Sequence, residues 1–212
     1  MQVGIIHQGA SVSSLWGKSI PVEGISILQK DVADTQLMNA CDVIIDFDFE
    51  TNPGRIEWYR QTAKPVLIAS CLLTLEQLGI TNEPIARFNH WPSLQERNCA
   101  ELAVKEEQYS TFESVFTQLN IDFETTRDVP GFVSARILAS IINEAFFALE
   151  ENVSTKAEID TAMKLGTNYP KGPFEWCNAI GSKTVYALLH QLSAHELRYT
   201  PASLLKKAAY EQ

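Results

Sequence analysis

The residues best placed to bind a phosphate group follow the first apolar run of the chain. Val3 to Ile6 is typical of a short strand, and His7-Gln8-Gly9-Ala10-Ser11-Val12 comes directly after it. In a dinucleotide-binding fold, a Gly-x-Gly-x-x-Gly turn here brings backbone amides close to a pyrophosphate. Only the middle glycine, Gly9, is present. Asp31, about 20 residues further on, lies where an acidic residue binds the ribose hydroxyls. The pattern predicts a degenerate nucleotide site with Gly9 and Asp31 as its candidate residues.

Side chains that could bind a metal are scattered. The cysteines form no Cys-x-x-Cys pair and have no histidine at the spacing of a zinc site; they are Cys41, Cys71, Cys99 and Cys177. We therefore expect reduced, mostly buried thiols and no metal centre.

Short apolar runs in the first 126 residues must position the phosphate-binding turn. They are Val3–Ile6, Ile25–Leu28, Asp42–Phe47, Pro65–Ala69, Ile85–Phe88 and Leu102–Val104. Helical patterns at Ile56 to Thr62 and Leu73 to Leu78 separate some of them, which favours a mainly parallel sheet. The expected fold class is α/β, a reduced Rossmann-like domain over residues 1–126 with its ligand at the carboxyl ends of the strands.

The second half of the chain carries dense helix signals. The Pro-Gly pair in Asp128-Val129-Pro130-Gly131-Phe132 ends whatever precedes it, and about twenty residues without either amino acid follow. Their apolar positions recur with the i, i+3, i+4, i+7 spacing of a helix. Thr155 and Glu158 predict a capping box for a second helix that ends at Gly166.

A rigid turn from Tyr169 to Trp176 and another helix starting near Ser182 are expected next. Residues 127–212 should therefore form an all-helical domain.

This stretch resembles the C-terminal domain of the NAD-dependent 3-hydroxyacyl-CoA dehydrogenases. The matching segments are Asp128–Phe132, Arg136, Asn143–Ala145, Glu158–Gly166, Tyr169–Pro170, Gly172–Glu175 and Ile180–Gly181. The resemblance implies NAD-linked oxidation of a 3-hydroxyacyl-CoA in fatty-acid metabolism. It also implies that the helical domain closes over the acyl-CoA and forms a homodimer. Most of the matching residues are breakers, caps, core or turn residues, so they mark the fold more than the chemistry.

The resemblance also implies a histidine base, because an imidazole titrates near working pH and a carboxylate can orient it. The family carries this base in a His-Phe-Phe-Asn-Pro run, with a Glu twelve residues after the His. Here Phe88-Asn89-His90-Trp91-Pro92 precedes Glu101. Aligning on Pro92 puts Phe88 at the base position. Aligning on His90 keeps a His90/Glu101 pair, with Glu101 eleven residues on.

Other family positions depart from the pattern. Ala135 stands where the family has an Asn that contributes an amide to the substrate site. Ser70 matches the serine that opens the family's Ser-Asn-Thr-Ser run, although it could equally cap the helix expected at Leu73 to Leu78. The nucleotide domain is also shorter than the family's between Asp31 and Cys41, which should remove a helical region and a strand.

The composition limits the possible partners. The chain has 212 residues and a net charge of −9, which makes nucleic acid or an anionic membrane an unsuitable partner. No apolar run approaches membrane-spanning length and no signal peptide is evident, so we expect a cytoplasmic protein.

Two hypotheses follow. The chain is either a small dehydrogenase with His90 as base, Glu101 orienting it and NAD bound, or a noncatalytic relative that keeps the fold, the dimer and an acyl-CoA groove without NAD. An imidazole of His90 within about 4 Å of Glu101 would favour the first.

Overall fold

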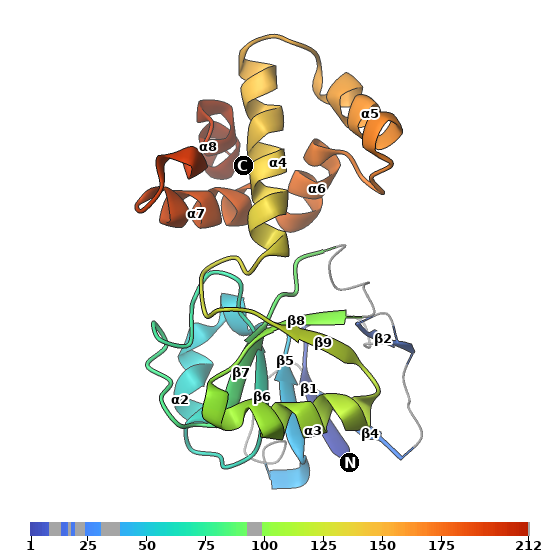
Figure 1. The fold of residues 1–212 in the computed structure, drawn as a ribbon, viewed down its shortest axis with the longest axis vertical. Helices are drawn as coiled ribbons and strands as arrows, with labels where there is room; N and C mark the ends of the chain where they lie inside the picture. The colour runs from blue at the N-terminus through green and yellow to red at the C-terminus, as the bar shows by residue number, and fades with distance from the viewer. Residues whose placement is uncertain (9–13, 17, 20–23, 31–38, 93–98, 212) are drawn as a thin grey trace. The chain divides into compact units, whose positions relative to one another are not determined.

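The computed structural model describes residues 1–8, 14–16, 18–19, 24–30, 39–92 and 99–211 (Figure 1). Gly9 and Asp31 lie outside the described residues. The chain divides into two compact units. The sheet unit consists of Met1–His90 and Leu94–Phe132, and the helical unit of Trp91–Ser93 and Val133–Gln212.

The sheet unit is built on one seven-stranded sheet in the order β4-β1-β5-β6-β7-β8-β9. Its strands are β1 (Gln2–Ile6), β4 (Ser26–Lys30), β5 (Val43–Asp46), β6 (Val66–Ala69), β7 (Ile85–Phe88), β8 (Cys99–Ala103) and β9 (Asp122–Thr125). All neighbours pair in parallel except β7 and β8. The predicted Rossmann-like, mainly parallel sheet is confirmed.

The strand order reverses between β1 and β5, because β1 pairs with β4 on one side and β5 on the other. Such a switch point is where open α/β sheets bind ligands. The order β4-β1-β5-β6-β7 corresponds to strands 2-1-4-5-6 of the dinucleotide fold and lacks its outermost strand. In the described part of the chain β4 is the edge strand. The expected loss of a helical region and a strand between Asp31 and Cys41 falls mostly outside the described residues.

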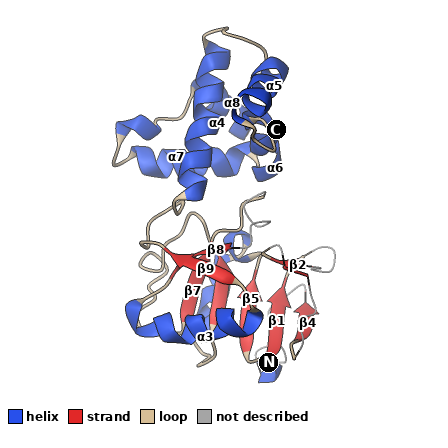
Figure 2. Ribbon diagram, turned by 45° about the vertical axis from the view of Figure 1, so that its right-hand side comes forward, coloured by secondary structure: helices blue, strands red, loops and turns tan. Residues whose placement is uncertain are grey.

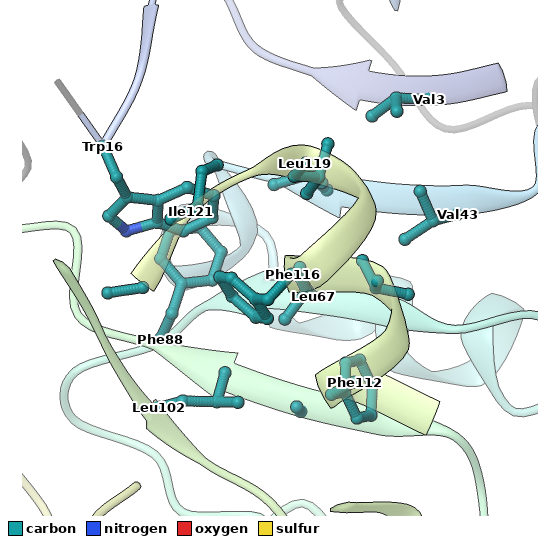
Figure 3. Packing of buried hydrophobic residues seen from close by; sticks show 14 of the residues in the cluster. Val3, Trp16, Val43, Leu67, Phe88, Leu102, Phe112, Phe116, Leu119 and Ile121 are labelled. Carbon is teal, nitrogen blue, oxygen red and sulfur yellow. The ribbon is translucent and has the colours of Figure 1, made fainter. Parts of the chain in front are cut away.

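Two apolar clusters cover the two faces of the sheet because side chains alternate along each strand. On one face, α3 (Tyr109–Leu119) lies across the strands (Figures 1 and 2) and buries Phe112, Val115, Phe116 and Leu119. Figure 3 shows Trp16 packed beside Phe88 and Phe116 in this cluster. Trp16 lies between the short strands β2 (Ser14–Leu15) and β3 (Lys18–Ser19). The described residues after β1 thus include a small β-ribbon.

The opposite face is covered by short elements that follow β5. These are the 3₁₀-helices η1 (Phe49–Thr51) and η2 (Pro53–Arg55) and the helix α2 (Ile56–Tyr59). Phe49 and Tyr59 are fully buried against residues such as Ile44 and Ile68.

The expected helix at Leu73 to Leu78 is wrong, because these residues form turns. The side-chain oxygen of Gln77 accepts from the Thr74 amide (2.9 Å), and the Thr74 hydroxyl accepts from the Gln77 amide (3.1 Å). Gly79 follows with φ +67, a left-handed conformation that ends the turn. The reciprocal caps satisfy the backbone locally without a longer helix. A further 3₁₀-helix, η3 (Glu106–Gln108), precedes α3.

The helical unit contains α4 (Ser134–Glu150), α5 (Lys156–Thr167), α6 (Pro173–Ile180), α7 (Ser182–Ser193), η4 (Leu197–Tyr199) and α8 (Ser203–Tyr210). The predicted capping box of Thr155 and Glu158 is confirmed. No described helix has both the length and the apolar character needed to cross a membrane.

Two predicted boundaries in this unit are wrong. Helix α5 continues through Gly166 and ends at Thr167, where the left-handed conformation of Asn168 (φ 56) caps it. The turn expected over Tyr169 to Trp176 contains the start of α6, because Pro173 is well suited to the first helical position. The Asp160 carboxylate accepts the Phe174 amide (2.8 Å), and this close approach needs Gly172, since a Cβ there would clash with Asp160.

Candidate functional site

His7 and Asp48 meet at the switch point of the sheet. His7 follows β1 and Asp48 lies two residues beyond β5, and these are neighbouring parallel strands. The His7 Nδ1 atom lies 3.1 Å from Asp48 Oδ1. The Gln8 amide donates to Asp48 Oδ2. Both carboxylate oxygens of Asp48 are therefore bound by groups at the end of β1.

A buried network holds the backbone before Asp48. Asp46 is fully buried and accepts hydrogen bonds from Arg55 (2.9 and 3.1 Å) and the Tyr59 hydroxyl (2.7 Å). The Asp48 amide donates to Asp46 Oδ1 (3.0 Å). Burial raises the pKa of Asp46, while Tyr59 and Arg55 act to lower it. A paired, buried carboxylate of this kind fixes the loop that carries Asp48.

His90 lies among aromatic rings. Its ring centroid is 4.6 Å from that of Phe47 and 5.9 Å from that of Phe88. Burial lowers the pKa of His90 to about 4; nearby His7 also lowers this pKa, and Asp48 raises it. Its Nδ1 atom is buried and has no hydrogen-bond partner among the described residues. His90 is thus a neutral imidazole at physiological pH.

Glu101 is paired with Asn89. The Asn89 amide donates to the Glu101 carbonyl (3.1 Å), so the antiparallel register of β7 and β8 places these two residues opposite each other. The Asn89 side-chain amide then donates to Glu101 Oε2 (3.0 Å). His90, two residues beyond the end of β7, contacts the rings of Phe47 and Phe88. Within the described residues no hydrogen bond joins His90 to Glu101.

Ser70 directly follows β6 and is buried. Its hydroxyl donates to the Leu73 carbonyl (2.8 Å), and its own carbonyl accepts from Arg87 (3.0 Å). These bonds shape the turn after β6. Ser70 therefore bonds within this turn and does not cap a helix at Leu73 to Leu78.

Glu50, Asp48 and Asn89 carry site features that the sequence reasoning missed. The Glu50 carboxylate accepts the amides of Cys71 (2.8 Å) and Leu72 (2.5 Å), and burial raises its pKa. Asn89 could have been found, because it lies twelve residues before Glu101, which is the family's spacing from base to carboxylate. No pattern in the sequence marks Glu50 or Asp48.

The described residues at the switch point do not fit a dinucleotide pyrophosphate. Two described donors at the end of β1, the Gln8 amide and the His7 imidazole, are both bound to Asp48. A phosphate group at these two donors would have to compete with a carboxylate. No set of three His, Cys, Asp or Glu side chains within the described ranges could hold a metal ion.

Comparisons with known proteins identify the helical part of the chain. Residues 131–212 match the family model "3-hydroxyacyl-CoA dehydrogenase, C-terminal domain". The 3-hydroxyadipyl-CoA dehydrogenase of Escherichia coli K12 is 46% identical over 84 residues, which are 39% of this chain and 18% of that protein. The 3-hydroxybutyryl-CoA dehydrogenase of Clostridioides difficile is 40% identical over 102 residues, 46% of this chain and 36% of that protein.

Solved structures extend the likeness to the fold of both units. The (S)-3-hydroxybutyryl-CoA dehydrogenase of Ralstonia eutropha gives a TM-score of 0.71 at 24% identity, over 86% of this chain and 69% of that one. The Escherichia coli 3-hydroxybutyryl-CoA dehydrogenase gives 0.69 at 20% identity, over 85% of this chain and 41% of that one. The matches to the two curated relatives span well under half of those proteins. Residues 131–212 are thus similar in sequence to the C-terminal domain of the 3-hydroxyacyl-CoA dehydrogenases, and the fold of the chain is similar to that of the solved dehydrogenases.

Proposed function

We propose that this protein binds an acyl-CoA-type thioester but does not carry out the NAD-linked oxidation of its relatives. The observation that carries the proposal is the Asn89–Glu101 pair. Asn89 lies twelve residues before Glu101 and donates to its carboxylate at 3.0 Å, as a family histidine base would at that spacing. A carboxamide has no basic lone pair to take up the proton of a 3-hydroxyl group, so the base is absent from this pair.

The cofactor side of the site supports the same proposal. The donors at the end of β1 are bound to Asp48, so the described residues offer them to no pyrophosphate. Ala135, fully buried in α4, has no side-chain donor for the substrate carbonyl. Loss of one such donor costs on the order of 3 kcal/mol of barrier in enzymes that depend on it.

The ligand class comes from the relatives. Those named above act, by their names, on hydroxyacyl-CoA substrates, and the family-model match lies over residues 131–212 of the helical domain. We place a nucleotide-binding-type domain at residues 1–126 and the acyl-CoA-binding helical domain at residues 127–212. We also propose a homodimer and a cytoplasmic location, the latter supported by the free thiols of Cys41, Cys71 and Cys177.

A second proposal is NAD-linked oxidation of a 3-hydroxyacyl-CoA in fatty-acid metabolism. In it His90 acts as the base, Glu101 orients it, Ser70 contacts the substrate, and Gly9 and Asp31 bind NAD. The family resemblance supports it, as does the buried Nδ1 of His90 without a described partner. The Glu101 role would require the β7–β8 end to rearrange, because Asn89 donates to the Glu101 carboxylate and no hydrogen bond among the described residues joins Glu101 to His90.

Calorimetric titration with NADH and then acetoacetyl-CoA separates the two proposals. We expect acetoacetyl-CoA to bind and NADH oxidation to be absent. His90→Ala and Asn89→Ala form a matched pair for the activity assay. Oxidation of NADH by the unmodified protein that is lost in His90→Ala and kept in Asn89→Ala would establish the second proposal and overturn the first.

A further inference from the structure

We propose that Asp48 is a built-in anion that occupies the pyrophosphate position at the end of β1 and thereby excludes dinucleotides. Its two carboxylate oxygens bind two different donors. Oδ1 lies 3.1 Å from His7 Nδ1, and Oδ2 accepts the Gln8 amide. Because a carboxylate only accepts hydrogen bonds, the His7 Nδ1 atom carries the hydrogen in this contact.

The position of this contact in the fold gives it a role beyond that of a surface ion pair. The end of β1 at the switch point is where a dinucleotide fold presents backbone amides to a phosphate. The Gln8 amide lies two residues after β1 and its partner is an anion, as in that fold. Here the anion comes from the loop after β5, within the same chain.

The loop geometry keeps the carboxylate at this position. The Asp48 amide donates to Asp46 Oδ1 (3.0 Å), and Asp46 is itself held by Arg55 and Tyr59. The Asp48 carbonyl accepts the Thr51 amide (3.2 Å) and hydroxyl (2.8 Å). The Asp48 side chain is only 15% exposed. A phosphate approaching Gln8 would therefore meet a fixed negative charge.

This inference deepens the proposed function but rests on different residues from the Asn89–Glu101 pair. The probe is inorganic pyrophosphate, titrated by calorimetry into the full chain, into Asp48→Ala and into Asp48→Asn. Asp42→Ala is the matched control, because Asp42 accepts the Gln2 amide (2.7 Å) at the opposite end of β1 and its removal changes the net charge equally. We expect Asp48→Ala to bind pyrophosphate at least tenfold more tightly than the unmodified protein and Asp42→Ala.

The Gln8 amide resonance gives a second readout. In the unmodified protein the chemical shift of this amide should stay unchanged when pyrophosphate is added, whereas in Asp48→Ala it should change. If Asp48→Ala fails to fold, the test relies on Asp48→Asn, because the Asn side chain has the same shape as that of Asp but carries no charge. Equal pyrophosphate affinity in folded Asp48 variants and the control would overturn the inference and leave the proposed function intact. NADH binding by the unmodified protein would also overturn it, but only accompanying NADH oxidation would overturn the proposed function.

Discussion

At the scale of single residues, the buried imidazole of His90 should make the protein sensitive to acid. Burial lowers the pKa of His90 from 6.5 to about 4, so between these values the unfolded chain binds a proton that the folded chain does not. Stability must therefore fall as the pH drops through this window. At pH 5 the loss from this group is about 2 kcal/mol relative to pH 7.5.

The variant His90→Met tests this, because its side chain fills similar space and cannot be protonated. In urea unfolding we expect the variant and the unmodified protein to differ little at pH 7.5 and the variant to be the more stable at pH 5. The measurement at pH 7.5 is the control for packing changes. Stability curves that run parallel between pH 7.5 and 5 would contradict a lowered pKa of His90.

The sequence predicts which residues could be catalytic more easily than it predicts which residues they contact. The sequence marks His90 and Glu101 as a possible pair because both types suit proton transfer at nearly the right spacing. The pairing of β7 with β8 decides otherwise, since Asn89 lies opposite Glu101 and donates to its carboxylate. A shift of one residue moves a side chain to the other face of a sheet, and the sequence does not fix that register.

At the scale of elements, Arg87 joins β7 to the segment that leads out of the sheet unit. Its guanidinium is fully buried and binds Asp128 (2.6 Å), the Val129 carbonyl (2.7 Å) and the Ser70 carbonyl (3.0 Å). It also lies 4.2 Å from the centre of the Phe132 ring. The Asp128-Val129-Pro130-Gly131-Phe132 motif is therefore anchored to the sheet by one buried cation.

We expect Arg87→Met to lower the free energy of unfolding of the sheet unit by about 3–5 kcal/mol. Methionine at this position would leave the Asp128 carboxylate and the Ser70 and Val129 carbonyls without the guanidinium that they bind. Arg60→Met is the control: Arg60 pairs with Glu57, whose side chain is 66% exposed, and donates to the Leu78 carbonyl, so the loss should be smaller, about 1–2 kcal/mol. Urea unfolding followed by tryptophan fluorescence measures both. Similar urea midpoints for Arg87→Met and Arg60→Met would show that Arg87 does not anchor the Asp128–Phe132 motif to the sheet.

Some of the strands and helices could be predicted from the sequence and others could not. Strands β1, β5, β6 and β7 were found because strands buried on both faces form continuous apolar runs. Strand β4, at the sheet edge, was found from the short apolar run Ile25–Leu28. Strand β9 was missed, since Asp122–Thr125 is mostly exposed and has no such run. Helix α6 was missed because its Pro and Gly residues, which cap it, are equally typical of a turn.

At the scale of the whole molecule, α5 is the helix that most needs a partner. Only Asp160 of its twelve residues is buried, and Leu165 is 82% exposed. A helix of this length is marginal in water unless an apolar face is packed. Within its unit α5 is tied mainly by polar contacts, from Asp160 to the Phe174 amide and from Lys164 to Glu175. A second copy of the chain would supply the missing apolar cover.

We therefore expect a homodimer in sedimentation velocity, and Leu165→Glu should weaken it by at least about tenfold in Kd, because the interface would have to bury an unpaired charge. Leu197→Glu is the matched control: Leu197 is also an exposed leucine of the helical unit (85%) but lies in η4, away from α5 in the sequence. A monomeric unmodified protein, or equal weakening by the two variants, would contradict an interface on α5. A dimer lost in Leu165→Glu alone would show that α5 is stabilised by association, which explains how so exposed a helix remains folded.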